Sequence, residues 1–237
     1  MELIYEGKAK RVYRADRGLI MEFKDEVTAG DGARRDAAPG KGILAAELSS
    51  LLLKYIEAAG VPTHLIEFVP PRSMLVRPAR VLPLEIIVRY KAYGGFLKRM
   101  PHVRPLAEFR RPIVEFHLKD DRLHDPLLLE DDVVEAGLAT EAELDIARRM
   151  ALKAATALRE LYRKADCDLL DVKFEFGRID SELVLVDEIS GDTFRVLCGG
   201  EHLDKEYYRR TGDVVGLVER YKKLLEITSR LLRELGA

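Results

Sequence analysis

A strictly alternating segment late in the chain restricts the fold more than any other feature. Within Asp168–Gly177 the apolar side chains fall on one face of a strand, and three charged side chains fall on the other: Asp171, Lys173 and Glu175. A second apolar run, Leu183–Val186, follows after a short loop and ends in Asp187 and Glu188. This pattern predicts an antiparallel hairpin that buries one face and presents charges on the other.

The charged face of this hairpin indicates a site for a metal–nucleotide complex, because Mg²⁺ binds a few carboxylate oxygens and completes its shell with water and phosphate. A loop with an odd number of residues, such as Arg178–Asp180, places Asp187 on the face of Glu175, whereas an even loop places it on the opposite face. We predict the shared face, since a metal held by Glu175 and Asp187 requires it. Such a site is typical of enzymes that use ATP.

The composition indicates a globular chain without affinity for nucleic acid or membranes. The 237 residues suffice for one large domain or two closely packed lobes, and the net charge of −2 provides no general attraction for polyanions. The N-terminus lacks a signal-peptide pattern and no apolar run approaches ~20 residues, so we expect a cytoplasmic protein. Cys167 and Cys198 have neither metal-ligand spacing nor the density of a disulfide framework, and we expect both to be reduced.

The order of the expected elements favours an α+β architecture with two lobes. Strands are predicted within residues 3–5, 11–13, 19–23, 64–69, 73–77, 84–88 and 113–118. The segment Arg77–Pro83 contains two prolines, which disfavour both helix and central strand, and it is the expected hinge. We therefore expect a small antiparallel β-rich lobe over residues 1–77 and a larger α+β lobe over residues 78–237.

Three helices are expected. Apolar residues at helical spacing predict helices over residues 43–59 and 214–235. The capping box Thr140–Glu143 predicts the start of a third helix that runs to about residue 165. The polar, glycine-rich segment Gly30–Gly42 is predicted to be a long loop.

Three further segments contain residues suited to phosphate or carboxylate ligands, each with an alternative interpretation. Lys8 and Lys10 follow the flexible Gly7 and either cover phosphates or lie on a solvated turn. The loop around Asp31 and Gly32 is either functional or simply a mobile surface segment. Arg89 follows an apolar strand and either binds an anion in a bidentate manner or flanks a surface turn.

Taken together, these segments resemble the SAICAR synthetase family of purine biosynthesis. The matching segments keep their order along nearly the whole chain: Tyr5–Lys10, Thr28–Ala33, Leu97–Arg99, Glu115–Phe116, Lys119–Asp121, His124–Pro126, Asp171–Gly177, Asp187–Ser190, Asp192–Arg195 and Asp204–Lys205. Any one of these matches is weak, but their number and common order make chance a poor explanation.

The resemblance implies a two-lobed fold, distantly similar to protein kinases, with ATP between the lobes and the small lobe over its phosphates. It implies an ATP-dependent carbon–nitrogen ligase that joins L-aspartate to carboxyaminoimidazole ribonucleotide (CAIR). In this reaction the CAIR carboxylate takes the γ-phosphoryl group, the amine attacks the acyl phosphate, and phosphate leaves. The expected partners are these small molecules with Mg²⁺, and the chain is expected to form a homo-oligomer.

The resemblance also implies roles for individual residues. ATP contacts are implied for Lys8, Lys10, Lys119 and the backbone from Arg80 to Leu82, with Mg²⁺ held by Glu175 and Asp187. Substrate contacts are implied for Asp31, Gly32, Arg89, Gly95, Asp171, Arg195 and Lys205. Gly95 stands where many members have serine, so its backbone N–H or a water must make that contact. Lys173 and Arg195 are implied as catalytic, with Lys173 close to the transferring phosphoryl group.

Two other functions remain as alternatives. A kinase-like phosphotransferase for small hydroxyl compounds would need an asparagine metal ligand in its catalytic loop, and this chain contains no asparagine. A non-catalytic nucleotide sensor would have no need of Lys173, Glu175 or Arg195, and the chain has all three.

Overall fold

A five-stranded antiparallel sheet forms the first part of the fold. The computed structural model describes residues 2–30 and 34–236. The sheet has the order β1-β2-β3-β7-β6. Its strands are β1 (Leu3–Glu6), β2 (Lys10–Ala15), β3 (Gly18–Phe23), β6 (Leu65–Val69) and β7 (Ser73–Val76). All five lie where the sequence predicted strands, and the turn that carries Lys8 joins β1 to β2.

The segment between β3 and the first helix contains a second, small sheet. β4 (Glu26–Ala29) and β5 (Arg34–Ala37) pair antiparallel, so the prediction of one long loop from Gly30 to Gly42 is wrong for residues 34–37, and also for residues 41–42, where the first helix begins. The expected roles of Asp31 and Gly32 fall outside the described residues.

The second large sheet has the order β10-β9-β8-β11-β13-β14, with β12 paired to β11. Its strands are β8 (Arg80–Lys91), β9 (Glu108–Leu118), β10 (Leu127–Leu128), β11 (Cys167–Ile179), β12 (Glu182–Val186), β13 (Phe194–Cys198) and β14 (Glu201–His202). β11 lies at its centre and pairs with β8, β12 and β13. The sheet therefore converges on the strand with the alternating pattern.

The helices are α1 (Lys41–Ala58), α2 (Gly95–Arg99), α3 (Glu130–Glu135), α4 (Glu141–Arg163), α5 (Glu206–Thr211) and α6 (Val214–Leu235), with a short 3₁₀ turn at Asp121–Leu123. The capping box is present, because Glu143 N donates to Thr140 Oγ1 over 3.2 Å and Thr140 N donates to Glu143 Oε2 over 2.8 Å. α4 packs on β11 and β8 and covers the apolar face of the second sheet, where Val172, Phe174 and Phe176 are buried.

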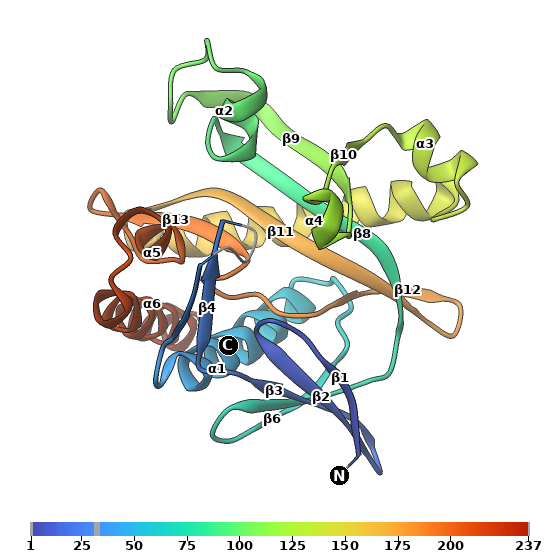
Figure 1. The fold of residues 1–237 in the computed structure, drawn as a ribbon, viewed down its shortest axis with the longest axis horizontal. Helices are drawn as coiled ribbons and strands as arrows, with labels where there is room; N and C mark the ends of the chain where they lie inside the picture. The colour runs from blue at the N-terminus through green and yellow to red at the C-terminus, as the bar shows by residue number, and fades with distance from the viewer. Residues whose placement is uncertain (1, 31–33, 237) are drawn as a thin grey trace.

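α1 joins the two large sheets through one continuous apolar core. It packs on β3, β6 and β7 of the first sheet and also on α6 and α4. Figure 1 shows α1 between the two sheets, with α6 beside it. Buried side chains from both parts of the chain belong to the same cluster, among them Leu48 and Leu52 of α1 and Leu224 and Leu231 of α6.

The expected hinge contains the start of a strand. β8 begins at Arg80 and runs through Pro83, so the expectation that the two prolines disfavour a central strand is wrong for residues 80–83. Pairing between β8 and β11 shifts register between Glu175 and Gly177, opposite Glu85 and Val81. Pro83 lies at this irregularity, where a residue without an N–H is tolerated, and its carbonyl accepts from Lys119 N over 3.0 Å.

The two cysteines form a disulfide, so the prediction that both are reduced is wrong. They lie 31 residues apart in the sequence, but β11 and β13 pair antiparallel and place Cys167 directly opposite Cys198, with 4.3 Å between the Cα atoms. No local spacing signals such a pair, because it depends on the long-range pairing of the strands.

The hairpin of β11 and β12 also differs from the predicted register. Asp180 and Ser181 form an even, two-residue loop, so Glu175 lies opposite Val186 and not in phase with Asp187. The prediction of an odd loop is therefore wrong. Asp187 follows the last residue of β12 and has a φ of 66°, so the chain leaves the strand at this residue and the alternation of faces no longer applies.

Candidate active site

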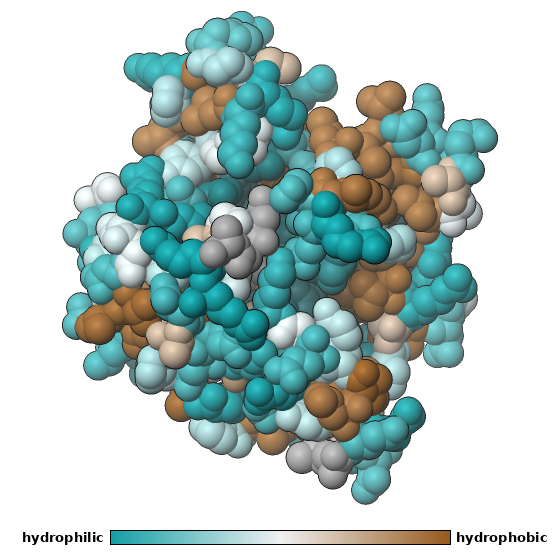
Figure 2. Space-filling model, in the orientation of Figure 1, coloured by the Kyte–Doolittle hydropathy of each residue, from teal (hydrophilic) through white to brown (hydrophobic). Residues whose placement is uncertain are grey.

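Two adjoining cavities lie on the charged face of the second sheet. The larger, of about 630 Å³, is lined by the β1–β2 turn, β8, β11 and the segment after β12. The smaller, of about 170 Å³, is lined by β8, β11, β13 and α5. Lys173, Asp192 and Thr193 line both cavities. Hydrophilic side chains dominate the middle of the face seen in Figure 2.

Lysines and carboxylates alternate in the larger cavity. Glu175 accepts hydrogen bonds from Lys119 and, over 2.9 Å, from Lys173. Lys173 also donates to Glu85 over 2.7 Å. Burial alone would lower the pKa of Lys173, but the carboxylates of Glu175 and Glu85 outweigh it and raise the pKa well above its ordinary value. Lys173 therefore stays cationic at the junction of the two cavities.

Lys10 links the first sheet to the end of β12. Its ammonium donates to Asp187 and, over 2.8 Å, to Glu188. Burial would raise the pKa of Asp187, but Lys10 and Lys173 outweigh it and hold the pKa well below its usual range. Asp187 is thus a carboxylate at neutral pH, and it lines the same cavity as Glu175 although the two are out of phase in the hairpin.

The residues present fit a bound Mg²⁺ that shares its shell with a nucleotide. Glu175 and Asp187 supply two carboxyl groups to one cavity with room for phosphate. Mg²⁺ in phosphoryl-transfer sites commonly takes one or two carboxylates, with phosphate and water as its other ligands. Within residues 2–30 and 34–236, no group of three or more His, Cys, Asp or Glu residues is arranged as an all-protein metal site. The donor set therefore suits a metal that arrives with phosphate.

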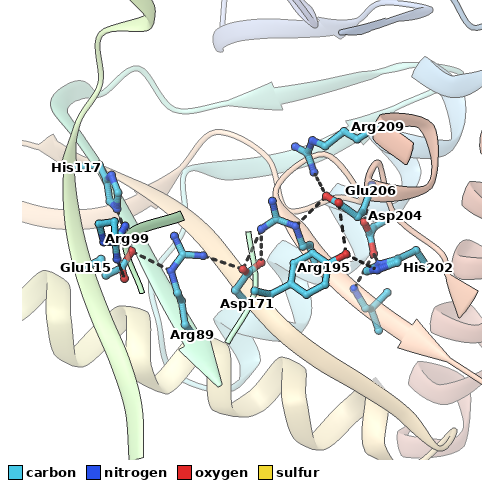
Figure 3. Close-up of polar contacts among 12 residues, drawn as sticks. Arg89, Arg99, Glu115, His117, Asp171, Arg195, His202, Asp204, Glu206 and Arg209 are labelled. Atoms are coloured by element: carbon cyan, nitrogen blue, oxygen red, sulfur yellow. Dashed lines mark hydrogen bonds and ion pairs between the residues drawn. The ribbon is translucent and has the colours of Figure 1, made fainter. Parts of the chain in front are cut away.

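The smaller cavity lies over a line of buried ion pairs, drawn in Figure 3. Asp171 accepts from Arg89 over 2.8 Å and from Arg195 over 2.9 Å. Glu115 accepts from Arg89 over 2.8 Å, from Arg99, and lies 3.0 Å from His117 Nε2. Burial would raise the pKa of Glu115, but the contacts with His117 and Arg89 lower it to about 2.

The other end of this line is organised by α5. Glu206 accepts from Arg195 and from Arg209, each over 3.2 Å. His202 lies 3.0 Å from Asp204 at one ring nitrogen, as Figure 3 shows. Two carboxylates thus hold Arg195, Asp171 on one side and Glu206 on the other. Arg89, Arg195 and Arg209 all line the smaller cavity, which gives it the character of an anion site.

A further cationic cluster lies at the edge of the larger cavity. Asp192 accepts from the buried Lys41 and lies 3.5 Å from Lys205 Nζ. Burial lowers the pKa of Lys205, and Asp192 offsets only part of that effect. Lys205 also lies 3.5 Å from Thr28 Oγ1, on β4. An anion bound here would lie beside both Lys173 and the β4–β5 hairpin.

The structure brings most of the predicted site residues into these two cavities. Lys8, Lys10, Lys119, Lys173, Glu175, Asp187 and Lys205 line the larger cavity, and Arg89, Gly95, Asp171 and Arg195 line the smaller one. Arg80 and Leu82 do not line either cavity. The Arg80 side chain is exposed and that of Leu82 is buried in the core.

Several residues of the site were not predicted from the sequence. Glu85, Asp192 and Thr193 line the larger cavity, and Arg209 lines the smaller one. Glu85 is the one charged residue in the otherwise apolar run Leu84–Val88, and that exception could have identified it. Arg209 lies in a short, highly charged helix whose composition does not distinguish it from a solvated surface.

The chain is similar to proteins of one family along nearly its whole length. The family model described as SAICAR synthetase matches residues 3–226. A phosphoribosylaminoimidazole-succinocarboxamide synthase from Pyrobaculum calidifontis is 70% identical over 232 residues, which cover 98% of this chain and 97% of the relative.

Solved structures show the same similarity. A phosphoribosylaminoimidazole-succinocarboxamide synthase from Ehrlichia chaffeensis superimposes with a TM-score of 0.92 at 34% identity, covering 96% of this chain and 98% of that one. A SAICAR synthetase described as a complex with ADP gives a TM-score of 0.90 at 36% identity, covering 94% and 96% of the two chains.

Proposed function

This chain belongs to the SAICAR synthetase family, and from that premise we propose how its two cavities carry out the family's ligation. The reaction joins L-aspartate to CAIR with conversion of ATP to ADP and phosphate. The observation that carries the proposal is the placement of Lys173 in the walls of both cavities. A nucleotide site and an anionic-substrate site that share one cation place phosphoryl donor and acceptor side by side.

The larger cavity is proposed to hold ATP. Its volume of about 630 Å³ and its lysines Lys8, Lys10 and Lys119 suit a triphosphate. A SAICAR synthetase of similar fold is described in complex with ADP, which supports nucleotide binding here. The backbone from Arg80 to Leu82 is proposed to contact adenine, since β8 leads from this segment directly to Glu85 in the cavity wall.

Glu175 and Asp187 are the proposed ligands of Mg²⁺. The metal would neutralise charge on the phosphates and orient them. Lys119 and Lys173 hold Glu175, and Lys10 holds Asp187, so both carboxylates are fixed in place. Because Lys10 and Lys119 lie beside these carboxylates, they are also proposed to contact the phosphates that the metal would bind.

The smaller cavity is proposed to hold CAIR. Arg89 and Arg195 bind its anionic groups, Asp171 fixes both guanidinium groups, and the backbone of Gly95 contributes a polar contact. Lys173 stabilises the negative charge that moves as the CAIR carboxylate oxygen attacks the γ-phosphorus and the bond to ADP breaks. Arg195 is proposed to contact the same carboxylate of CAIR.

Lys205 and the segment around Asp31 and Gly32 are proposed to bind L-aspartate. Lys205 lies beside Thr28 on β4, the strand that leads toward this segment. The amine of L-aspartate then attacks the acyl carbon, the carbon–oxygen bond to phosphate breaks, and the amine loses a proton to give the amide. Exclusion of water protects the acyl phosphate from hydrolysis.

The remaining proposals concern the whole chain. Residues 1–77 and 78–237 are proposed to act as two lobes around ATP, the chain is proposed to form a homo-oligomer, and it is proposed to work in the cytoplasm. In the described part of the chain no helix is long and apolar enough to cross a membrane.

The deciding experiment is an assay with CAIR, ATP, Mg²⁺ and L-aspartate. The purified protein should release ADP only when L-aspartate and CAIR are both present, with one SAICAR formed for each ADP. Omission of either substrate is the control. Release of ADP that does not depend on L-aspartate would contradict the ligase function and favour a phosphotransferase.

A further inference from the structure

His64 is a buried polar residue that the proposed reaction does not use. It lies in the segment between α1 and β6, and its side chain is only 3% exposed. Its Nε2 lies 3.0 Å from the main-chain oxygen of Asp187. A carbonyl oxygen can only accept, so the ring must carry its proton on Nε2 and donate to Asp187. The ring thus contacts the backbone of a proposed metal ligand.

The backbone of Asp187 needs such support. Its φ of 66° lies in the left-handed region, which is unfavourable for a residue with a side chain and persists only where the surroundings enforce it. This conformation ends the alternation of β12 and turns the Asp187 carboxylate into the larger cavity. A hydrogen bond to the main-chain oxygen of the same residue opposes rotation of its peptide group.

His64 is itself fixed from both sides. The backbone N–H of His64 donates to Leu185 O over 2.9 Å, and Leu185 N donates to Pro62 O over 2.9 Å. The segment that contains His64 therefore runs along the free edge of β12. The carbonyl of His64 accepts from Arg77 N over 2.7 Å, which ties it to the end of the first sheet. Asp187 is therefore positioned by Lys10 through its carboxylate and by His64 through its backbone.

We propose that His64 is a positioning residue that holds Asp187 in its left-handed conformation and so orients its carboxylate toward Mg²⁺ and the nucleotide phosphates. The inference rests on the proposed role of Asp187. The segment between α1 and β6 would thus contribute to nucleotide binding, although none of its residues lines the larger cavity.

The test compares two substitutions at this position. His64→Leu fills a similar space without a donor, whereas the amide nitrogen of His64→Gln can donate from nearly the place of Nε2. The affinity for ADP is measured by calorimetry with Mg²⁺ and with EDTA. The gain in ADP affinity on addition of Mg²⁺ should be about tenfold smaller in His64→Leu than in the wild type, a loss that corresponds to one hydrogen bond. His64→Gln should retain most of this gain. The exposed His102→Leu is the matched control.

Steady-state kinetics supply a second measurement. His64→Leu should raise the KM for Mg·ATP about tenfold and leave the KM for L-aspartate unchanged, a division that a general loss of stability would not produce. A Mg²⁺-dependent gain that persists in His64→Leu, or is lost equally in His64→Gln, overturns the inference alone. Wild-type affinity for ADP that does not respond to Mg²⁺ overturns the metal assignment as well.

The tautomer of the wild-type ring provides a test that needs no variant. The ¹⁵N spectrum of the His64 imidazole should show the proton on Nε2, protected from exchange with solvent. A neutral ring protonated on Nδ1 instead cannot donate to Asp187 and would overturn the inference even if His64→Leu failed to fold.

Discussion

At the scale of single residues, the two glycines at the start of α2 should respond differently to substitution. Gly94 has a φ of 52°, and a Cβ there would lie 2.9 Å from Arg195 Nη2, which Asp171 and Glu206 hold in place. Gly94→Ala should therefore displace Arg195 and raise the KM for CAIR at least about tenfold.

The neighbouring Gly95 is the matched control. A Cβ there would meet Arg89 Nη2 at 3.6 Å and Arg99 Nη1 at 3.8 Å, both ordinary contacts. Gly95→Ala should leave the KM for CAIR unchanged, and Gly95→Ser should leave it unchanged or lower it. Steady-state kinetics with CAIR varied measure both. Equal losses in Gly94→Ala and Gly95→Ala would refute the steric argument.

A second prediction concerns Glu175. In Glu175→Gln a neutral amide replaces a proposed metal ligand and leaves Lys119 without its carboxylate and Lys173 with that of Glu85 alone, so the KM for Mg·ATP should rise at least about tenfold while the fold persists. The exposed Glu182→Gln, on the same hairpin, is the control. Unchanged turnover of Glu175→Gln at limiting Mg²⁺ would contradict the role as metal ligand.

A third prediction concerns pH and the buried carboxylate of Glu115. Its pKa of about 2 in the folded protein lies below the ordinary value of 4.5. Between these two pH values the carboxyl group is therefore mostly protonated in the unfolded chain and mostly ionised in the folded protein. The stabilisation is present above pH 4.5 and is lost as the pH falls toward 2. It amounts to about 3 kcal/mol for a shift of this size.

Urea unfolding of the wild type and of Glu115→Gln at several pH values measures this effect. The stability gap between them should be largest near pH 7 and shrink by about 3 kcal/mol between pH 4.5 and 2. The comparison cancels the titration of the other carboxylates. A gap that stays constant over this range would show that Glu115 is not held ionised by Arg89 and His117.

Sequence reasoning at this scale succeeded where a residue's position follows from its immediate neighbours. Asp171, Lys173 and Glu175 share a face because strand alternation is local, and each of them lines one or both of the two cavities. Asp187 reaches its place through a single left-handed residue that no periodicity encodes. Its inclusion in the site was predicted from a hairpin register that is wrong, yet it lines the larger cavity.

At the scale of elements, the disulfide should stabilise the pairing of β11 with β13. A crosslink that closes a loop of this length, with its ends 31 residues apart, contributes about 3.5 kcal/mol by restricting the unfolded chain. The double variant Cys167→Ser/Cys198→Ser should therefore unfold at lower denaturant concentration. Its KM for CAIR should change little, because Asp171 and Arg195 pair further along the same strands.

Chemical denaturation with and without dithiothreitol checks this prediction. The reductant should lower the stability of the wild type and leave the double serine variant unaffected. Equal stability of the oxidised and reduced wild type would mean that strand pairing alone carries the stability.

Elements were predictable where their own sequence specifies them. The capping box at Thr140 located α4, and helical spacing located α1 and α6. β13 and α5 were missed, since Phe194–Cys198 is short and Glu206–Thr211 is almost entirely polar. β13 acquires its structure by pairing with β11, and α5 by packing on α6. Such tertiary support cannot be found in a short window of sequence.

At the scale of the whole molecule, the proposed lobes should unfold together. α1 belongs to the first part of the chain but packs on α4 and α6 of the second, and one apolar core runs through both. Scanning calorimetry should show a single transition, with van't Hoff and calorimetric enthalpies in agreement. Residues 78–237 expressed alone should not fold stably, because α6 would lose its packing against α1. Two separate transitions would contradict this prediction.

The overall architecture was predictable to the level of a β-rich first part and a mixed second part. The hinge was not, because the sequence shows two prolines but not the irregular pairing that admits Pro83 into β8. The continuity of the core was also hidden, since it depends on helices that are some 160 residues apart in the chain, α1 and α6.

The mutual pairing of lysines and carboxylates in the larger cavity makes nucleotide binding an exchange of partners. When Lys10 and Lys119 turn to phosphates, Asp187 loses the ammonium of Lys10 and Glu175 keeps only that of Lys173, and a buried carboxylate with fewer cations around it is costly. On the proposed metal assignment the cavity should therefore select for the metal-loaded nucleotide over free ATP, which would take these lysines without supplying a cation. Because little net charge is neutralised in such an exchange, affinity should depend less on salt than at a site of unpaired lysines.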